Sequence, residues 1–248
     1  MYDKNKQQYL KKNGFSVFHP KAVLFDMDGV LFDSMPLHSR SWSGVCTEFG
    51  LDMSPEEAYM HEGRTGEATI NILTQRYWGR NATPEEIQHI YEAKCKAFNA
   101  LPEAPKMPGA EDVLAKVKAA GLKALVVTGS GQASLLERLE TNFPSCFTAE
   151  EVVSSKDVKR GKPYPEPYLL GLERAGVKPW EAIVVENAPL GVCAAVAARV
   201  FTVAVNTGPL PDEVLVREGA DLLFSSMKCL SEQLLDILKP YSLTSGEA

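Results

Sequence analysis

The sequence predicts an α/β fold in which a doubly wound parallel sheet carries an inserted all-helical unit. Four short apolar runs rich in β-branched residues lie at residues 21–26, 122–128, 182–186 and 200–205. Helix-like stretches separate them, and strands that alternate with helices favour a parallel sheet. Ligands of such sheets bind beyond the carboxyl ends of the strands, so we expect the polar residues that end these runs to share one crevice.

The first run, KAVLFD at residues 21–26, is typical of a buried strand because it is apolar until it stops at acidic residues and a glycine. The later runs, LKALVVT, AIVVE and VFTVAV, are bounded by Gly, Asn, Pro or Ser, which favour turns. Residues 109–120 and 166–175 have the helical pattern expected before the second and third runs.

The segment between the first two runs has helical periodicity and no convincing strand. Helix-start signals occur in it at Ser54 (SPEE) and Thr83 (TPEE). Pro-containing stretches at both of its ends are plausible hinges. We expect a core domain made of residues 21–36 and 106–240, interrupted by a helical insertion at residues 37–105. An N-terminal extension (1–20) precedes the core and a C-terminal tail (241–248) follows it.

Composition narrows the function classes. Thirty-two acidic residues against 26 Lys and Arg give a net charge of −6, and without a basic face neither a nucleic acid nor an anionic membrane is an expected partner. The longest apolar region, 182–205, is interrupted by polar residues and Pro, so we expect no membrane span. Five scattered Cys and no recognisable secretory signal favour a cytoplasmic protein with reduced thiols, which we expect to be a monomer.

The strongest chemical signal is Asp26-Met27-Asp28-Gly29 at the end of the first run. Two carboxylates at i and i+2, followed by a glycine that lets the backbone approach a ligand, suit a Mg²⁺ site with one residue free to attack. The same pattern alone also fits a turn or a calcium loop.

The segment FDMDGVLFDS resembles the first motif of the haloacid dehalogenase superfamily of phosphotransferases, and three further motifs follow in order. Thr128 matches the second-motif hydroxyl, Lys162 in KPYP matches the third-motif lysine, and Glu186-Asn187 stand where the family usually carries two acidic residues. The position of the insertion is similar to that in the subfamily that contains β-phosphoglucomutase and many small-molecule phosphatases. The resemblance implies a Rossmann-like core and a helical cap.

The resemblance also implies a mechanism for phosphoryl transfer. Asp26 would attack phosphorus and become an aspartyl-phosphate, and Asp28 would protonate the leaving oxygen and then deprotonate the attacking water. The two carboxylates need opposite protonation states, which a metal on Asp26 and desolvation around Asp28 would provide.

A phosphate site is implied at the ends of the second and third motifs. Thr128 and the amides of Gly129 and Ser130 would hold phosphoryl oxygens, Gly29 would allow close approach, and Lys162 would add a point charge. Taken alone, Thr128 is also a candidate to cap the following helix. A lysine in a loop such as Lys162 is otherwise simply solvated.

The implied cofactor is Mg²⁺, held by Asp26, Asp28, Glu186 and Asn187. Asn187 departs from the family pattern, in which an aspartate is common. Its amide oxygen can ligate Mg²⁺ or hold a metal-bound water, but the site loses one negative charge. Because Asn187 precedes Pro189, the alternative is a helix N-cap.

Three cap residues are candidates for substrate binding. His38 corresponds to a histidine of β-phosphoglucomutase-like members and is equally compatible with a structural role. Arg64, between glycines in an expected loop, and Lys94 are cations that could meet a hydroxyl or a second phosphate. For Lys94, exposed helical charge is the competing interpretation.

These observations predict a Mg²⁺-dependent phosphohydrolase of a small phosphorylated metabolite, a sugar or polyol phosphate, that works through an aspartyl-phosphate. One alternative is a β-phosphoglucomutase with the same core chemistry. A mutase needs a cap cation for the non-transferring phosphate, and this chain has Gly66 where we align the family arginine, with Arg64 two residues away. A second alternative, suggested by Asn187, is a catalytically silent ligand-binding relative.

Overall fold

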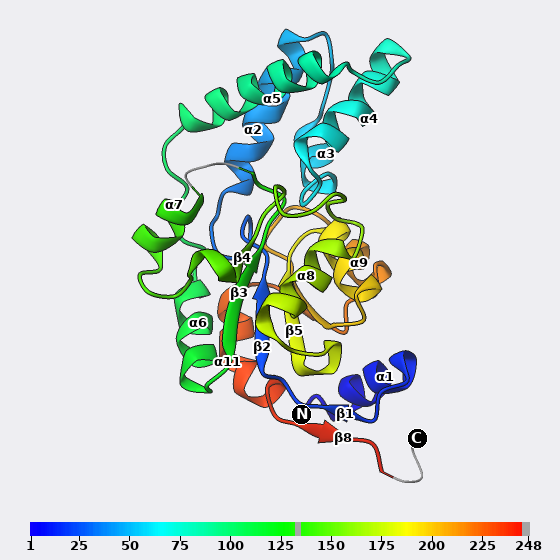
Figure 1. Ribbon diagram of the computed structural model, residues 1–248, viewed down its shortest axis with the longest axis vertical. Coiled ribbons are helices and arrows are strands. Elements are labelled where there is room, and N and C mark those ends of the chain that lie inside the picture. Colours follow the sequence, from blue (N-terminus) through cyan, green and yellow to red (C-terminus); the bar gives the residue numbers. More distant parts are fainter. Residues whose placement is uncertain (132–134, 245–248) are drawn as a thin grey trace.

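A six-stranded parallel sheet forms the centre of the computed structural model, which describes residues 1–131 and 135–244. The strand order is β4-β3-β2-β5-β6-β7 (Figure 1). The strands in chain order are β2 (Ala22–Phe25), β3 (Lys123–Val127), β4 (Val152–Val153), β5 (Ala182–Glu186), β6 (Phe201–Val205) and β7 (Leu222–Phe224). The predicted doubly wound α/β fold is confirmed. Strand β2 pairs with β3 on one side and with β5 on the other.

Alternate residues of each strand pack on opposite faces of the sheet, as the two-residue period of a strand requires. In β2, Val23 and Phe25 belong to one hydrophobic cluster, whereas Ala22 and Leu24 belong to the other. Both faces are buried, which explains why the run is apolar throughout rather than alternating.

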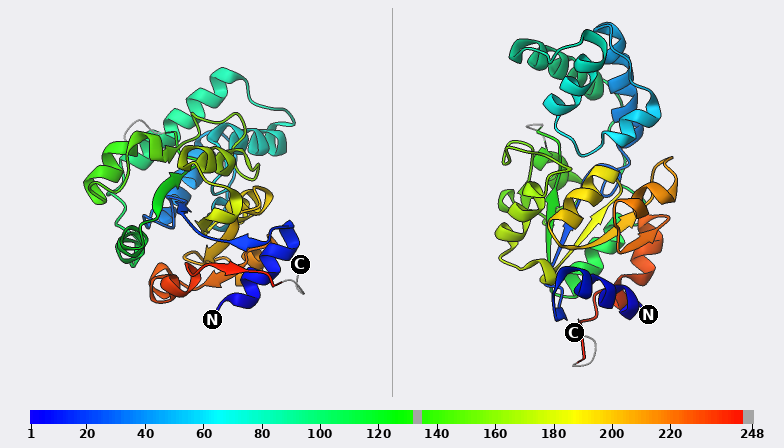
Figure 2. Two further views of the ribbon diagram at one scale, coloured as in Figure 1. Left: turned by 60° about the horizontal axis from the view of Figure 1, so that its bottom comes forward. Right: turned by 90° about the vertical axis from the view of Figure 1, so that its right-hand side faces the viewer.

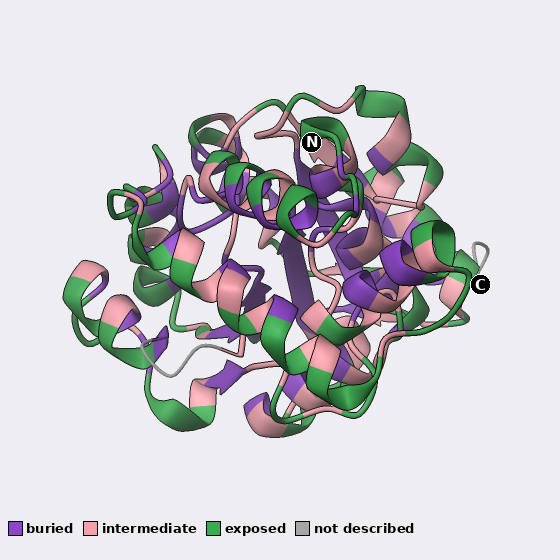
Figure 3. Ribbon diagram, turned by 90° about the horizontal axis from the view of Figure 1, so that it is seen from above, coloured by how far each residue is buried: buried purple, intermediate pink, exposed green. Residues whose placement is uncertain are grey.

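Helices cover both faces (Figures 1 and 3). The first face carries α6 (Ala110–Ala119), α7 (Leu135–Asn142) and α11 (Met227–Ile237), and the second carries α8 (Glu166–Ala175) and α9 (Pro189–Ala197). The short helix α10 (Asp212–Arg217) packs beside α9, and the 3-10 turns η1 (Ala149–Glu151) and η2 (Pro179–Glu181) lead into β4 and β5.

The inserted segment is helical and has its own core. It contains α2 (Met35–Glu48), α3 (Pro55–Met60), α4 (Gly66–Trp78) and α5 (Pro84–Asn99), and its apolar cluster is separate from those of the sheet. Ser54 and Thr83 cap α3 and α5 as predicted, with a capping box between Thr83 and Glu86. Figure 2 shows these helices as a layer beyond one end of the sheet, which we call the cap.

The two ends of the chain pack together at the opposite end of the sheet (Figure 2). Helix α1 (Asp3–Asn13) buries Tyr9, whose hydroxyl donates to the Arg199 carbonyl at 2.9 Å. Strand β1 (Val17–Phe18) pairs antiparallel with β8 (Tyr241–Ser242). No role is predicted for these segments from the sequence, because a two-residue strand leaves no periodic signal. Within the described ranges, none of the helices has the length and apolar character that a membrane span needs.

Asp221, just before β7, provides a test of the packing at this sheet edge. Its carboxylate accepts a hydrogen bond from the Thr202 amide at 2.8 Å, yet burial raises the pKa of Asp221 to about 6. The folded chain therefore holds this proton to higher pH than the unfolded chain, and stability falls as pH rises between about 4 and about 6.

We expect Asp221→Asn, which keeps an acceptor oxygen and removes the charge, to match the wild type below about pH 4. Near neutral pH its unfolding temperature should be higher by about 2–6 °C. Thermal unfolding followed by circular dichroism over this range measures the effect, with Asp52→Asn at an exposed loop position as the control. An equal gain at low and neutral pH would contradict the assignment.

Candidate active site

The polar residues that end the strands meet at one edge of the sheet. Asp26 follows β2, Thr128 follows β3 and Glu186 ends β5, while Lys162 lies in the segment before α8. All four side chains are buried. The parallel arrangement places these strand ends side by side, so residues up to 160 positions apart in the chain share one site.

Lys162 is the centre of this cluster. Its ammonium donates to Asp26 Oδ1 at 2.5 Å, to Glu186 Oε1 at 2.6 Å and to the Val127 carbonyl at 3.0 Å. These are three acceptors for three N–H bonds, so the buried charge is fully paired. The interpretation of Lys162 as a solvated loop lysine is wrong, because its side chain is only 1% exposed.

Glu186 holds Lys162 from the other side. Its Oε1 also accepts from the Tyr168 hydroxyl at 2.8 Å, and its Oε2 accepts from the amides of Asn187 and Ala188 at 2.9 and 3.0 Å. Each carboxylate oxygen thus has two donors. Glu186, which the sequence predicts as a metal ligand, contacts the Lys162 ammonium in this structure.

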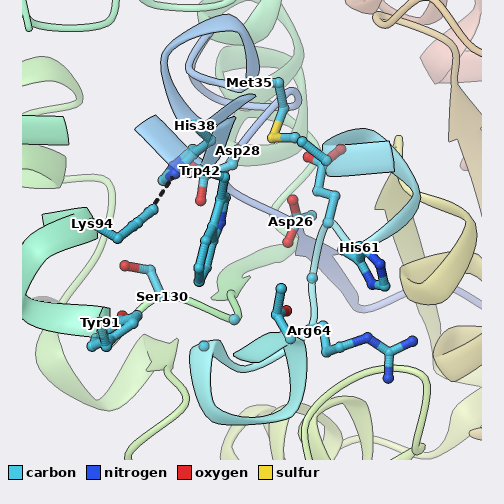
Figure 4. Close-up of a pocket in the computed structure, with 16 residues that line it drawn as sticks. Asp26, Asp28, Met35, His38, Trp42, His61, Arg64, Tyr91, Lys94 and Ser130 are labelled. Atoms are coloured by element: carbon cyan, nitrogen blue, oxygen red, sulfur yellow. Dashed lines mark hydrogen bonds and ion pairs between the residues drawn. The ribbon is translucent and has the colours of Figure 1, made fainter. Parts of the chain in front are cut away.

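Asp28 is held from the cap. Its Oδ1 accepts from Ser34 Oγ at 2.5 Å and contacts His38 Nε2 at 3.2 Å, and Lys94 Nζ lies 2.8 Å from His38 Nδ1 (Figure 4). An ammonium only donates, so Nδ1 accepts and Nε2 carries the proton that faces Asp28. Lys94 is 4% exposed and lies over the Phe98 ring, so its interpretation as exposed helical charge is wrong.

The environments of the two aspartates shift their pKa values in opposite directions. Burial raises the pKa of Asp26 to about 8, with Glu186 and Asp28 adding to the rise and Lys162 opposing it. Burial also favours a raised pKa for Asp28, but His38 and the hydrogen bonds from His38 and Ser34 outweigh it and hold that pKa below its usual range. The contacts of Asp28 with His38 and Ser34 could not be predicted from the sequence.

Asn187 contacts the cap rather than its own helix. Helix α9 begins at Pro189 with Ala188 as N-cap and no side-chain capping bond, so the N-cap interpretation of Asn187 is wrong. Its Nδ2 donates to both carboxylate oxygens of Glu62, at 2.9 and 3.1 Å. Among the described residues, its buried Oδ1 has no hydrogen-bond partner. Glu62 was missed, because a lone Glu in the polar loop before α4 carries no sequence signal.

The remaining candidates line the space between cap and core. Thr128 Oγ1 accepts from the Ser130 amide at 3.0 Å, and no helix begins at the residues that directly follow, so Thr128 is not a helix cap. Ser130 and Gly129 line a cavity of about 70 Å³ with Asp26, Asp28, His38, Glu62, Arg64 and Lys94. In Figure 4 the Arg64 guanidinium points away from the two aspartates.

Comparison with known proteins places this site in a family. Residues 23–205 match the family described as haloacid dehalogenase-like hydrolase, which is most of the chain. The chain belongs to this family. It is therefore an enzyme, and the predicted resemblance is confirmed.

Two relatives and one solved structure illustrate the range of the hydrolase's neighbours. The chain is 35% identical to hexitol phosphatase A of Escherichia coli, covering 84% of this chain and 92% of that protein. It is 30% identical to the phosphorylated carbohydrates phosphatase of Thermotoga maritima, covering 88% and 98%. The structure of a Bacteroides vulgatus protein provisionally named a β-phosphoglucomutase is 55% identical, with a TM-score of 0.93 and coverage of 96% and 98%.

The donor set of the hydrolase fits a divalent cation that prefers oxygen. Among the described residues no three His, Cys, Asp or Glu side chains are placed to hold a metal by themselves. The Asn187 amide, which lies against Gly29, adds an oxygen ligand type: among the described residues its buried Oδ1 has no hydrogen-bond partner. Carboxylate and amide oxygens are the ligand types that Mg²⁺ accepts.

Gly191 in α9 tests the role of Glu186. A Cβ at Gly191 would overlap Glu186 Oε1, which is the oxygen that binds Lys162 and Tyr168. We expect Gly191→Ala to lower the free energy of unfolding by about 2–3 kcal/mol, because the carboxylate must move and leave buried donors unpaired.

Chemical denaturation measures this change, and Gly44→Ala is the matched control. Gly44 also lies within a helix, α2, but a Cβ there meets open space. The control should gain up to about 1 kcal/mol from helix propensity. Equal effects of the two substitutions would show that Glu186 is not fixed in place.

Proposed function

We propose that the protein is a Mg²⁺-dependent phosphohydrolase that removes phosphate from a sugar or polyol phosphate through an aspartyl-phosphate on Asp26. The observation that carries the proposal is the buried Lys162 bound to Asp26 and Glu186, with Asp28 two residues away at the same strand end. The relatives named for hexitol and carbohydrate phosphates support the substrate class.

In the proposed reaction, Asp26 attacks phosphorus in line with the leaving oxygen. The charge of Lys162, the Thr128 hydroxyl and the Gly129 amide offset negative charge on the transferring group, and such electrostatic stabilisation is the main source of catalysis in phosphoryl transfer. Water then attacks the acyl phosphate, and phosphate leaves while the Asp26 carboxylate is restored. The second step makes the reaction a hydrolysis rather than a transfer.

Asp28 moves the proton in both steps. A phosphate dianion beside Asp28 raises its pKa, because added negative charge favours the protonated form. The carboxyl can then protonate the leaving oxygen and later accept a proton from water. His38, held by Lys94, keeps Asp28 aimed into the cavity.

Asp26, Asp28, Glu186 and Asn187 would hold the Mg²⁺. When bound, the ion supplies charge that offsets repulsion between the carboxylates and the phosphate dianion. The intact Asp26, Asp28, Thr128 and Lys162 set argues against a catalytically silent relative.

We expect Asp26→Asn to reduce phosphate release by about 10³-fold or more, because the near-isosteric amide is a poor nucleophile. The measurement is inorganic phosphate released from hexitol phosphates in Mg²⁺, with circular dichroism to verify folding. Asp112→Asn, on the exposed face of α6, is the control and should retain full activity. Near-normal turnover by Asp26→Asn would refute the covalent route.

A β-phosphoglucomutase is the second candidate, favoured by the 55% identical Bacteroides vulgatus protein. Because the Arg64 guanidinium points away from the aspartates, we expect phosphate release from hexitol phosphates to exceed conversion of β-glucose 1-phosphate to glucose 6-phosphate. Both assays need Mg²⁺ and a bisphosphate primer, since an unprimed mutase would be inactive. Efficient isomerisation with little free phosphate would establish the mutase instead.

A further inference from the structure

Glu62 is a cap residue whose carboxylate lies inside the core site. It sits in the loop 61–65 between α3 and α4, only 7% exposed, and it lines the cavity with Asp26 and Asp28. Burial and the nearby carboxylates of Asp26, Glu186 and Asp28 raise its pKa. Placing an acidic side chain there is costly unless a specific partner receives it. Among the described residues, that partner is the amide of Asn187.

Glycines let this loop lie directly on the core. Gly63 has a φ of 81°, and a Cβ there would come within 2.8 Å of the Lys162 side chain. A Cβ at Gly129 would lie 2.7 Å from the Gly63 carbonyl, and one at Gly29 would overlap the Asn187 amide. The contact between Glu62 and Asn187 is therefore part of a close-packed surface that joins the cap loop to the core.

An amide differs from a carboxylate in having two unlike ends. A carboxylate oxygen only accepts, so Glu62 selects the orientation in which Asn187 presents its NH₂ group to the cap. The selection applies to the ionised carboxylate, because a protonated Glu62 also has an O–H that can donate to the amide oxygen. The Asn187 Oδ1 is then left on the other side, buried and without a partner among the described residues.

We propose that Glu62 is a positioning residue that orients the Asn187 amide so that its oxygen faces the metal site. This inference rests on the Mg²⁺ site of the proposed function. An aspartate at this position would need no such help, since its two oxygens are equivalent, and its charge would repel Glu62. Asn187, which departs from the family pattern, and Glu62, the buried glutamate of the cap, thus act as a pair. Closure of the cap completes the metal site.

Mn²⁺ binding to the full chain, measured by calorimetry or by the paramagnetic signal of the free ion, tests this role without turnover. We expect Glu62→Ala to weaken Mn²⁺ affinity by about 10-fold or more, as is typical when a group that orients a ligand is removed. Glu62→Gln keeps an acceptor for the Asn187 amide and should retain most of the affinity. Glu67→Ala, an exposed acidic residue in the first turn of α4, is the control and should bind like the wild type.

The same substitution in an Asn187→Asp background separates orientation from charge. There Glu62→Ala should leave Mn²⁺ affinity unchanged or increase it, because a carboxylate needs no orientation and the repulsion is removed. Loss of affinity in both backgrounds, or an equal loss for Glu62→Gln and Glu62→Ala, would show that Glu62 acts only by its charge. Either result would overturn the proposal.

Hydrogen exchange in the presence of chelator tests the contact between Glu62 and Asn187 without metal binding. Glu62→Ala and Asn187→Ala should each speed exchange of the amides in 61–65, and the double variant should be no faster than the singles, because both remove one contact. Additive increases in the exchange rate would show that the two residues do not act through a shared contact. Absence of Mn²⁺ binding by the wild type would refute the metal site of the proposed function and the orienting role with it. Equal Mn²⁺ affinity of the wild type and Glu62→Ala would refute the orienting role alone.

Discussion

The buried ion cluster around Lys162 is the interaction on which the rest of the site depends. One ammonium is shared by Asp26 and Glu186, and its third bond goes to the carbonyl that ends β3. Removing either partner from such a cluster leaves an uncompensated buried charge, at a cost of about 3–5 kcal/mol. The cluster therefore joins three neighbouring strand ends and fixes the carboxylate that we propose as nucleophile.

Glycines, which have no side chain, are as necessary to this site as the charged residues. Gly191 leaves room for the Glu186 carboxylate, and Gly63 and Gly129 let the cap loop and the core backbone touch. At Gly63 the backbone also adopts a positive φ that other residues rarely take. Small-residue positions thus allow a dense polar network to form with little room for water, where electrostatic interactions are strongest.

Two separate contacts connect the cap to the candidate site. The pair of His38 and Lys94 holds Asp28, while Glu62 reaches the residue beside Glu186. Both contacts come from cap elements and are lost if the cap moves away. These cap contacts therefore set the orientation of groups that we propose to bind metal and transfer a proton.

The sequence by itself determined the fold class and the core motifs. Both follow from local patterns: apolar runs that end in polar residues, and Asp26, Asp28 and Lys162 at positions that a parallel sheet brings together. Only the tertiary structure decided which partner each group has. The role of Glu186 as an anchor for the lysine, the order of the aspartate pKa values and the importance of Glu62 depend on contacts between segments far apart in the chain. Such contacts leave no periodic trace in the sequence, because burial and hydrogen-bond partners are set by packing of whole elements.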